Sequence, residues 1–179
     1  LLTALANSFV SGGYDLRSML KLMVSSNAYQ LSSAYDGVWN ETYTPYFARH
    51  IPRRLMAEEL LDALFKSTNV GATLSVTGAA AVMKAVQLPD TTEGGGTYRT
   101  FLNNFGRGNR DDQPRSNDGS IVQALTLLND RIVTDRVKAT AKDSTIQKLL
   151  AASKDPATIA QGLYLSTLGR YPTLAERNA

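Results

Sequence analysis

Cysteine is absent from the 179-residue sequence, and histidine occurs once, as His50. Without cysteine, this segment cannot contain disulfides, thiol catalysis, iron–sulfur clusters, cysteine-bound zinc or covalent c-type haem attachment. A single histidine excludes a multi-histidine metal site, and a Ser-His-Asp arrangement would have to use His50. We expect His50 to be an ordinary, partly exposed residue before a helix start.

Long apolar runs and charge of one sign are also missing. No stretch approaches the roughly 20 apolar residues that span a bilayer, so we predict no transmembrane segment here. The 19 basic and 16 acidic residues give a net charge of +3 and are scattered. The loop FGRGNRDDQPRSNDGS, residues 105–120, is neutral, and we expect its charges to be balanced within the loop. Its charged residues are Arg107, Arg110, Arg115, Asp111, Asp112 and Asp118. Because nucleic-acid binding needs uncompensated positive charge, we predict no nucleic-acid partner.

The sequence does contain apolar residues at helical spacing. With 43% hydrophobic residues it can bury one core, so we predict that residues 1–179 form a single helical domain. Because the sequence opens on Leu1 and Leu2, already at helical spacing, and stops just after a helix start, we expect it to be truncated at both ends of a larger multidomain protein. The predicted fold class is all-α or nearly so, an irregular multi-helix domain with long ordered loops. A signal peptide on the parent protein stays open.

Local signals predict the first helices. One helix over residues 1–11 ends at Gly12, and Asp15 caps a second. Residues 51–67 are typical of a third helix, with Pro52 in its first turn. Its charged stripe consists of Arg54, Glu58 and Asp62. This stripe is either a solvated row of ion pairs or a face covered by another element.

The second half of the chain begins irregularly. We predict a loop with one short strand over residues 69–78, a short helix over 79–86, and a flexible connection at the triple glycine 94–96. Residues 97–106 add a helical turn or two. The longest helix is predicted over 121–140 and is capped by Asp118 or Ser120. Its predicted buried stripe is Ile121, Ala124, Leu125, Leu128 and Ile132.

The C-terminal region carries clear helix boundaries. A helix pair is predicted over residues 144–168, in which Asp155 is the N-cap of the second helix, Pro156 its first residue and Gly169 its terminator. The sequence TLAE, residues 173–176, is a capping box that predicts one more helix.

Few residues offer catalytic chemistry. Glu58 and Asp62, one helical turn apart, could serve acid–base work, but neighbouring arginines favour ion pairing. No G-x-S-x-G elbow is present, and the aspartates of the 105–120 loop lack the EF-hand pattern. We therefore assign no catalytic residue and no metal ligand.

The polar residues concentrate at the start of the third helix and around the loop before residue 121. The candidates for a polar network or binding surface are Arg53, Arg54, Glu58, Asp62, Arg107, Arg115, Gln123 and Asn129. If the network is structural, Arg54 or Arg115 should contact Glu58 or Asp62 directly. If instead the carboxylates are catalytic, they should line a concave pocket, with at least one raised pKa and no saturating arginine.

Several motifs resemble one family in order along the chain. These are DLRSMLKLMVSSNAYQLSS, IPRRLMAEELLDAL, VQLPD, FLNNFGRGNR, IVQALTLLND and YLSTLGRYPTLAE. Together they resemble the planctomycete-associated PSD-one domain, a domain of unknown function. Many relatives carry cysteines in the loop before IVQAL, whereas this chain has none, which puts any role of such cysteines in doubt here.

The resemblance implies a mainly helical domain of a large exported bacterial protein, periplasmic or at the cell surface, often fused to a planctomycete-type cytochrome c domain. On this basis we expect a non-catalytic binding or scaffolding module whose partners are other domains of the same polypeptide. We expect this segment to hold no cofactor. Any haem c would belong to an upstream domain of the parent protein. The alternatives are a hydrolase-type domain acting on an extracellular polysaccharide through Glu58 and Asp62, or an electron-transfer partner surface for the cytochrome.

Overall fold

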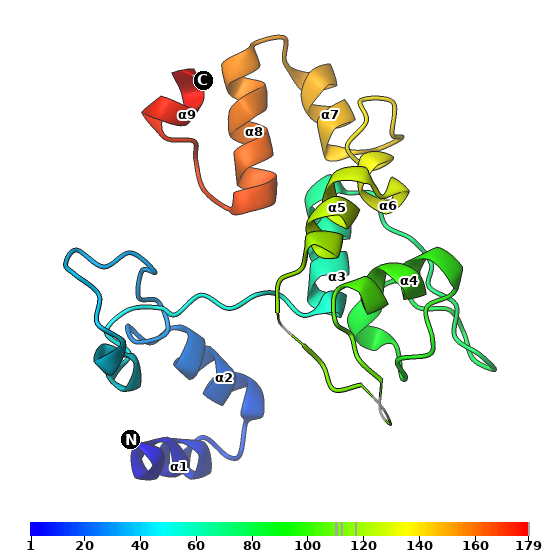
Figure 1. Ribbon diagram of the computed structural model, residues 1–179. Coiled ribbons are helices and arrows are strands. Elements are labelled where there is room, and N and C mark those ends of the chain that lie inside the picture. Colours follow the sequence, from blue (N-terminus) through cyan, green and yellow to red (C-terminus); the bar gives the residue numbers. More distant parts are fainter. Residues whose placement is uncertain (110, 112, 117, 179) are drawn as a thin grey trace. The chain divides into compact units, whose positions relative to one another are not determined.

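The computed structural model describes residues 1–109, 111, 113–116 and 118–178 (Figure 1). The described residues form helices joined by long loops, and their only β-pairing is an isolated bridge between Leu74 and Val82. The all-α prediction is therefore confirmed. Contacts divide the chain into two compact units, Leu1–Arg53 and Arg54–Ala179. The single-domain organisation stays a prediction, and each unit is described by itself.

The first unit contains α1 (Leu2–Ser11), α2 (Leu16–Val24) and a short 3-10 helix, η1 (Glu41–Tyr46). Asp15 caps α2 as predicted, because its carboxylate accepts a hydrogen bond from the Arg17 N–H at 2.9 Å. After α2, the rings of Tyr35, Trp39 and Tyr43 pack edge-on or tilted against one another. The Arg49 guanidinium covers the Trp39 ring at 4.0 Å.

The core of the second unit lies where α3 (Ala57–Thr68) meets α4 (Gly96–Asn104) and the 3-10 helix η2 (Ala85–Gln87). Ala57, Leu61 and Phe65 recur at every fourth position, so α3 presents one continuous apolar stripe to this core. The remaining core residues are Leu74, Ala85, Phe101, Leu102 and Ile132.

The predicted start of the third helix at residue 51 is wrong, since α3 begins only at Ala57. Met56 is extended, with ψ at 160°, and its N–H donates to the Glu59 carboxylate at 2.9 Å. This hydrogen bond from the N-cap backbone to the Glu59 side chain fixes the helix start at Ala57, short of Pro52. Residues 51–56 consequently form a non-helical stretch.

The predicted helix over 121–140 is in fact two helices, α5 (Ile121–Asn129) and α6 (Arg131–Thr134). Asp130 is extended and ends α5, and its carboxylate then caps α6 by accepting from the Ile132 N–H at 2.7 Å. Ser120 caps α5 as predicted. The predicted buried stripe is largely wrong: Ile132 is 4% exposed, but Ile121 is 80% and Leu128 72% exposed, and Ala124 and Leu125 are exposed too.

The segment before α4 also differs from prediction. The expected helix over 79–86 is replaced by the bridge residue Val82 and by η2. The triple glycine is not a free connection, because Gly94 is buried, its N–H donates to the Ser75 carbonyl at 3.1 Å, and Gly95 precedes α4 directly. Gly95 has φ at 72°, which glycine adopts without steric cost.

The C-terminal helices follow their predicted boundaries. They are α7 (Thr145–Ala152), α8 (Pro156–Leu168) and α9 (Leu174–Asn178). Asp155 caps α8, Gly169 ends it in the left-handed conformation, and the Thr173–Glu176 capping box is formed. Within the described ranges, none of the helices has the length and apolar character that a membrane crossing requires.

Candidate functional site

Glu58 lies in the first turn of α3 and is buried, with 8% of its surface exposed. Its neighbour Ala57 belongs to the core, so the helix start is held against the rest of the unit. A carboxylate at this position is favoured by the partial positive charge of the helix N-terminus. Even so, burying its charge is costly unless cations and hydrogen-bond donors compensate for it.

Arg115 provides the first compensation. Its two terminal nitrogens donate to the two carboxylate oxygens of Glu58, at 2.7 and 2.9 Å. This two-point geometry matches the planar guanidinium to the planar carboxylate. The predicted contact between an arginine of the 105–120 loop and the α3 acids is therefore confirmed.

Arg107 provides the second compensation from inside the protein, where it is 2% exposed. Its Nε lies 3.3 Å from Oε1 of Glu58. Its terminal nitrogens donate to the backbone carbonyls of Asp90, Thr91 and Glu93 at 2.6–2.8 Å. Arg107 thus ties α3 to the loop that precedes α4.

The prediction that the 105–120 loop balances its own charge is wrong for two of its arginines. Arg107 and Arg115 both pair with Glu58, 49 and 57 residues away along the chain. Arg110 and Asp112 lie outside the described residues. The charged stripe of α3 is accordingly covered by another element at Glu58.

Burial alone would raise the pKa of the Glu58 carboxyl, but the hydrogen bonds from Arg115 and the positive charges of Arg115 and Arg107 lower it overall. Hydrogen bonding to Glu58 in turn raises the pKa of Arg115. Glu58 is therefore held as a carboxylate, which accepts protons poorly and has none to donate near neutral pH.

This lowered pKa predicts how stability depends on pH. Above the ordinary glutamate value of 4.5, Glu58 is ionised in both the folded and the unfolded chain, and its full contribution is present. Below pH 4.5 the unfolded chain binds the proton at Glu58 before the folded chain does. The contribution of Glu58 to the free energy of unfolding therefore declines as the pH falls, until the pH is below the folded-state pKa. Between about pH 6 and about pH 3, we expect the free energy of unfolding to fall more steeply for the native chain than for Glu58→Gln. Denaturant titrations at each pH measure this, and parallel curves would contradict it.

Asp62, one turn after Glu58, contacts a different segment of the chain. Its two carboxylate oxygens accept from the backbone N–H groups of Ala85 and Val86, at 2.6 and 3.2 Å. These are the first two N–H groups of η2, which the helix itself cannot satisfy. Asp62 therefore anchors η2 to α3, and the two acids do not share a site.

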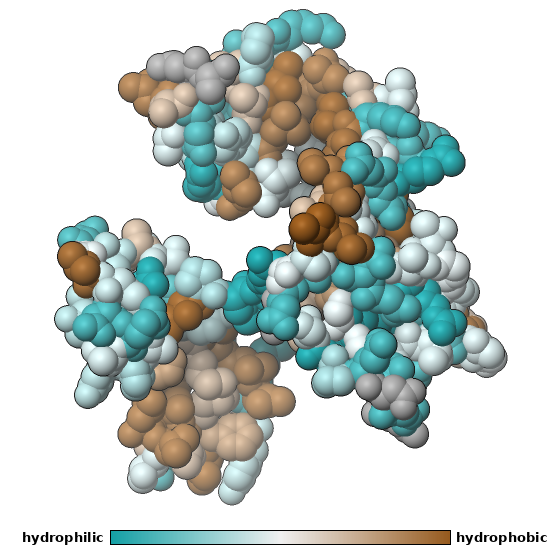
Figure 2. Space-filling view, viewed as in Figure 1, coloured by the Kyte–Doolittle hydropathy of each residue, from teal (hydrophilic) through white to brown (hydrophobic). Residues whose placement is uncertain are grey.

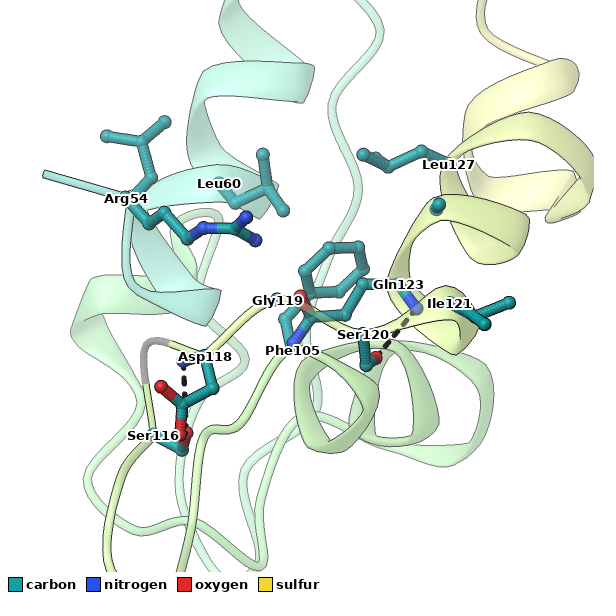
Figure 3. A pocket seen from close by; sticks show the side chains of 12 residues that line it. Arg54, Leu60, Phe105, Ser116, Asp118, Gly119, Ser120, Ile121, Gln123 and Leu127 are labelled. Atoms are coloured by element: carbon teal, nitrogen blue, oxygen red, sulfur yellow. Dashed lines mark hydrogen bonds between the residues drawn. The ribbon is translucent and has the colours of Figure 1, made fainter.

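A cavity of about 620 Å³ lies next to this network, between the start of α3 and α5. Arg54 and Gln123 are among its lining residues, together with Leu60, Phe105 and Leu127 (Figure 3). A Cβ on Gly119 would lie 2.5 Å from the Arg54 guanidinium, so the loop backbone and this side chain are in close contact.

The remaining two candidates lie elsewhere. Asn129 is exposed at the last position of α5. Arg53 is exposed and belongs to the other compact unit. The structure therefore joins Glu58, Arg107 and Arg115 in one network, places Arg54 and Gln123 in the adjacent cavity, and separates Asp62 from both.

Sequence reasoning missed a second buried arginine, Arg136. It donates to the carbonyls of Val70 and Ile132 and to the Tyr98 hydroxyl, at 2.7–2.9 Å. Its guanidinium also lies 4.7 Å from the Phe65 ring centre. The available signal was its spacing, because Arg136 follows the core residue Ile132 by four positions and thus continues the same face.

Comparisons with known proteins give one match. A family model described as PSD1, protein of unknown function (DUF1553), covers residues 1–179. No curated protein and no solved structure matches the chain.

Proposed function

The chain belongs to the PSD1 family of proteins of unknown function (DUF1553), and from this premise we propose that it is a non-catalytic binding and scaffolding module of a larger polypeptide. The parent is an exported bacterial protein that also carries a planctomycete-type cytochrome c domain, whose haem lies outside this segment. The motif resemblance supports the export and the cytochrome. The arrangement of α5 supports the binding role.

The observation that carries the proposal is the exposed apolar face of α5. Ile121, Leu125 and Leu128 fall on one side of this helix and Val122 borders them, and all four are exposed. Figure 2 shows hydrophobic surface over α5. This spacing is the one that predicts a buried stripe, and contiguous apolar surface of this kind marks interaction sites in soluble proteins.

The partner that we propose for this face is another domain of the same polypeptide. Family resemblance supplies companion domains, and domains on one chain meet at a high effective concentration, so a modest apolar surface is sufficient. The neighbouring 620 Å³ cavity adds a concave region with Leu55 and Leu127 on its walls.

A hydrolase role for Glu58 and Asp62 is less well supported. An acid catalyst needs a raised pKa and access to substrate, whereas Glu58 is buried and held by two arginines. Both oxygens of Asp62 accept from backbone N–H groups. These contacts match the structural role that an i, i+4 pair beside arginines favours.

Thiol labelling tests whether another domain covers the apolar face of α5. The method suits this chain because its own sequence has no cysteine. In the full-length parent protein, we expect the thiol introduced by Leu128→Cys to react at least about tenfold more slowly than the thiol introduced by Met83→Cys. Met83 is 67% exposed, close to the 72% of Leu128, and is the matched control. Tenfold protection corresponds to about 1.4 kcal/mol of interaction. Mass spectrometry of the labelled peptides gives both rates.

Two outcomes would overturn the proposal. Equal labelling rates at the two positions would mean that no domain covers α5. Protection that disappears on dilution of the parent protein would assign the face to a second copy instead of a domain of the same chain.

A further inference from the structure

A second cavity, of about 420 Å³, is also lined by part of the 105–120 loop and differs from the first in the residues that line it. Its walls come from three segments: the loop at Thr91 and Thr92, the α4 residues Arg99 and Asn103, and described residues of the 105–120 loop, among them Gln113. The described lining residues are polar in type apart from Pro114 and the glycines. The volume falls within the range of small-molecule sites, about 300–1,000 Å³.

Three polar side chains among the lining residues are available to a ligand. Among the described residues, the side chains of Arg99, Asn103 and Gln113 make no hydrogen bond or ion pair within the protein. Arg99 and Asn103 are four residues apart on α4, so they lie on the same face of the helix. The described lining residues therefore include one guanidinium side chain, two amide side chains and Thr92, all of them exposed.

The walls are held in place by the Glu58 network. Arg107 binds the carbonyls of Asp90, Thr91 and Glu93, which fixes the segment that carries Thr91 and Thr92. On the opposite wall, the Asn109 side chain accepts from the Gln113 N–H at 2.8 Å, and the Asn109 N–H donates to the Gln113 carbonyl at 2.7 Å. Prior fixing of this kind reduces the conformational entropy that the protein loses when a ligand binds.

Glycine is required where this loop turns back on itself. Gly108 has φ at 69°, and a Cβ there would lie 2.5 Å from the Gln113 carbonyl oxygen. The two sides of the loop can approach this closely only without a side chain at position 108. The fold therefore uses a glycine to shape the cavity wall.

We propose that this cavity binds a small hydroxylated carboxylate, a sugar acid, with Arg99 on the carboxylate and the amides of Asn103 and Gln113 on hydroxyl groups. Arg99 is the one charged residue among the described lining residues, so a singly charged acid is the best match. A guanidinium binds a carboxylate through two parallel hydrogen bonds. Amides donate and accept, as hydroxyl groups do, which makes them suitable partners for a polyol. The site is independent of the α5 face.

Calorimetric titration with glucuronate tests the proposal, with glucose as the neutral analogue. We expect glucuronate to bind to the native chain, and glucose to bind at least about tenfold more weakly because it lacks the carboxylate. Arg99→Ala should weaken glucuronate binding by a similar factor, and Arg99→Lys should recover part of it. Arg131→Ala is the matched control, because Arg131 is an exposed arginine in the same unit but outside the cavity.

Folding does not confound this test, since Arg99 is exposed and has no partner within the described residues. Equal binding of glucuronate and glucose, an unchanged affinity in Arg99→Ala, or no binding at millimolar glucuronate would overturn the proposal. A parallel titration with an oligouronide distinguishes the two sources of this chemistry. Binding of the oligomer would identify an acidic polysaccharide, and binding of the monomer alone would identify a free sugar acid.

Discussion

Replacing Glu58 with alanine is expected to lower the free energy of unfolding of the second unit by about 3–5 kcal/mol. The substitution leaves the buried Arg107 with backbone carbonyls as its hydrogen-bond acceptors among the described residues, and with Asp90 as its remaining nearby negative charge. Arg115 loses both of its carboxylate contacts as well. Breaking a buried ion pair from one side is costly because the remaining charge cannot return to water without opening the structure.

The measurement must report on the second unit. The only tryptophan, Trp39, lies in the first unit, so its fluorescence would follow the wrong transition. Amide hydrogen exchange of α3, measured at several denaturant concentrations, reports on the correct one. Lys66→Ala is the control on the same helix, because Lys66 is exposed, and we expect a change within about 0.5 kcal/mol.

A paired substitution separates loss of the ion pair from loss of side-chain packing. Glu58→Leu combined with Arg107→Met removes both buried charges while keeping apolar volume, so it should be less destabilising than Glu58→Ala alone. If Glu58→Ala costs less than about 1 kcal/mol, the network does not stabilise the unit. In that case the buried arginine must be stabilised by its carbonyl contacts alone.

The helix boundaries that the sequence predicts correctly are those set by neighbouring residues. Asp15, Ser120 and Asp155 each cap the helix that follows them, and Gly169 ends α8. Each cap forms between residues two or three positions apart, so composition over a few residues contains the necessary information. The capping box at 173–176 was predictable for the same reason.

The predictions that failed depend on competing local signals or on distant contacts. Pro52 is compatible with a first helical turn, yet the Met56–Glu59 cap starts α3 later. Apolar periodicity continues from residue 121 to 132, but Asp130 serves as the end of one helix and the cap of the next. Periodicity detects an apolar face and not what covers it, which is why the stripe of α5 was expected to be buried.

The candidate site was predictable only where two side chains recognise each other. Glu58 and Arg115 are complementary groups, and their pairing was anticipated from chemistry. Arg107 forms three of its contacts with backbone carbonyls, which any residue type supplies, so the sequence does not reveal them. The second cavity joins three separate segments, so it could not be predicted before the fold was known.

Arg136→Met is expected to destabilise the second unit by about 3 kcal/mol. The change removes donors from the Val70 and Ile132 carbonyls and from the Tyr98 hydroxyl, and it removes the guanidinium from the Phe65 ring. An acceptor left unpaired away from water costs about 1–3 kcal/mol. The Ile132 contact is buried and the other two are part-buried, and retained methylene packing offsets part of the sum. Because these contacts join the end of α6 to α4 and to the segment after α3, the loss should appear as faster amide exchange in all three.

A nearby arginine provides the comparison for Arg136. Arg131 lies on α6, and its side chain is exposed in an i, i+4 pair with Asp135, so Arg131→Ala should cost at most about 0.5 kcal/mol. Arg136→Lys keeps the positive charge but cannot direct three donors to three acceptors in a plane, so we expect it to recover only part of the lost stability. Full recovery by lysine would show that charge alone is required at this position. Equal effects of Arg131→Ala and Arg136→Met would contradict the assignment of Arg136 as the residue that holds these three segments together.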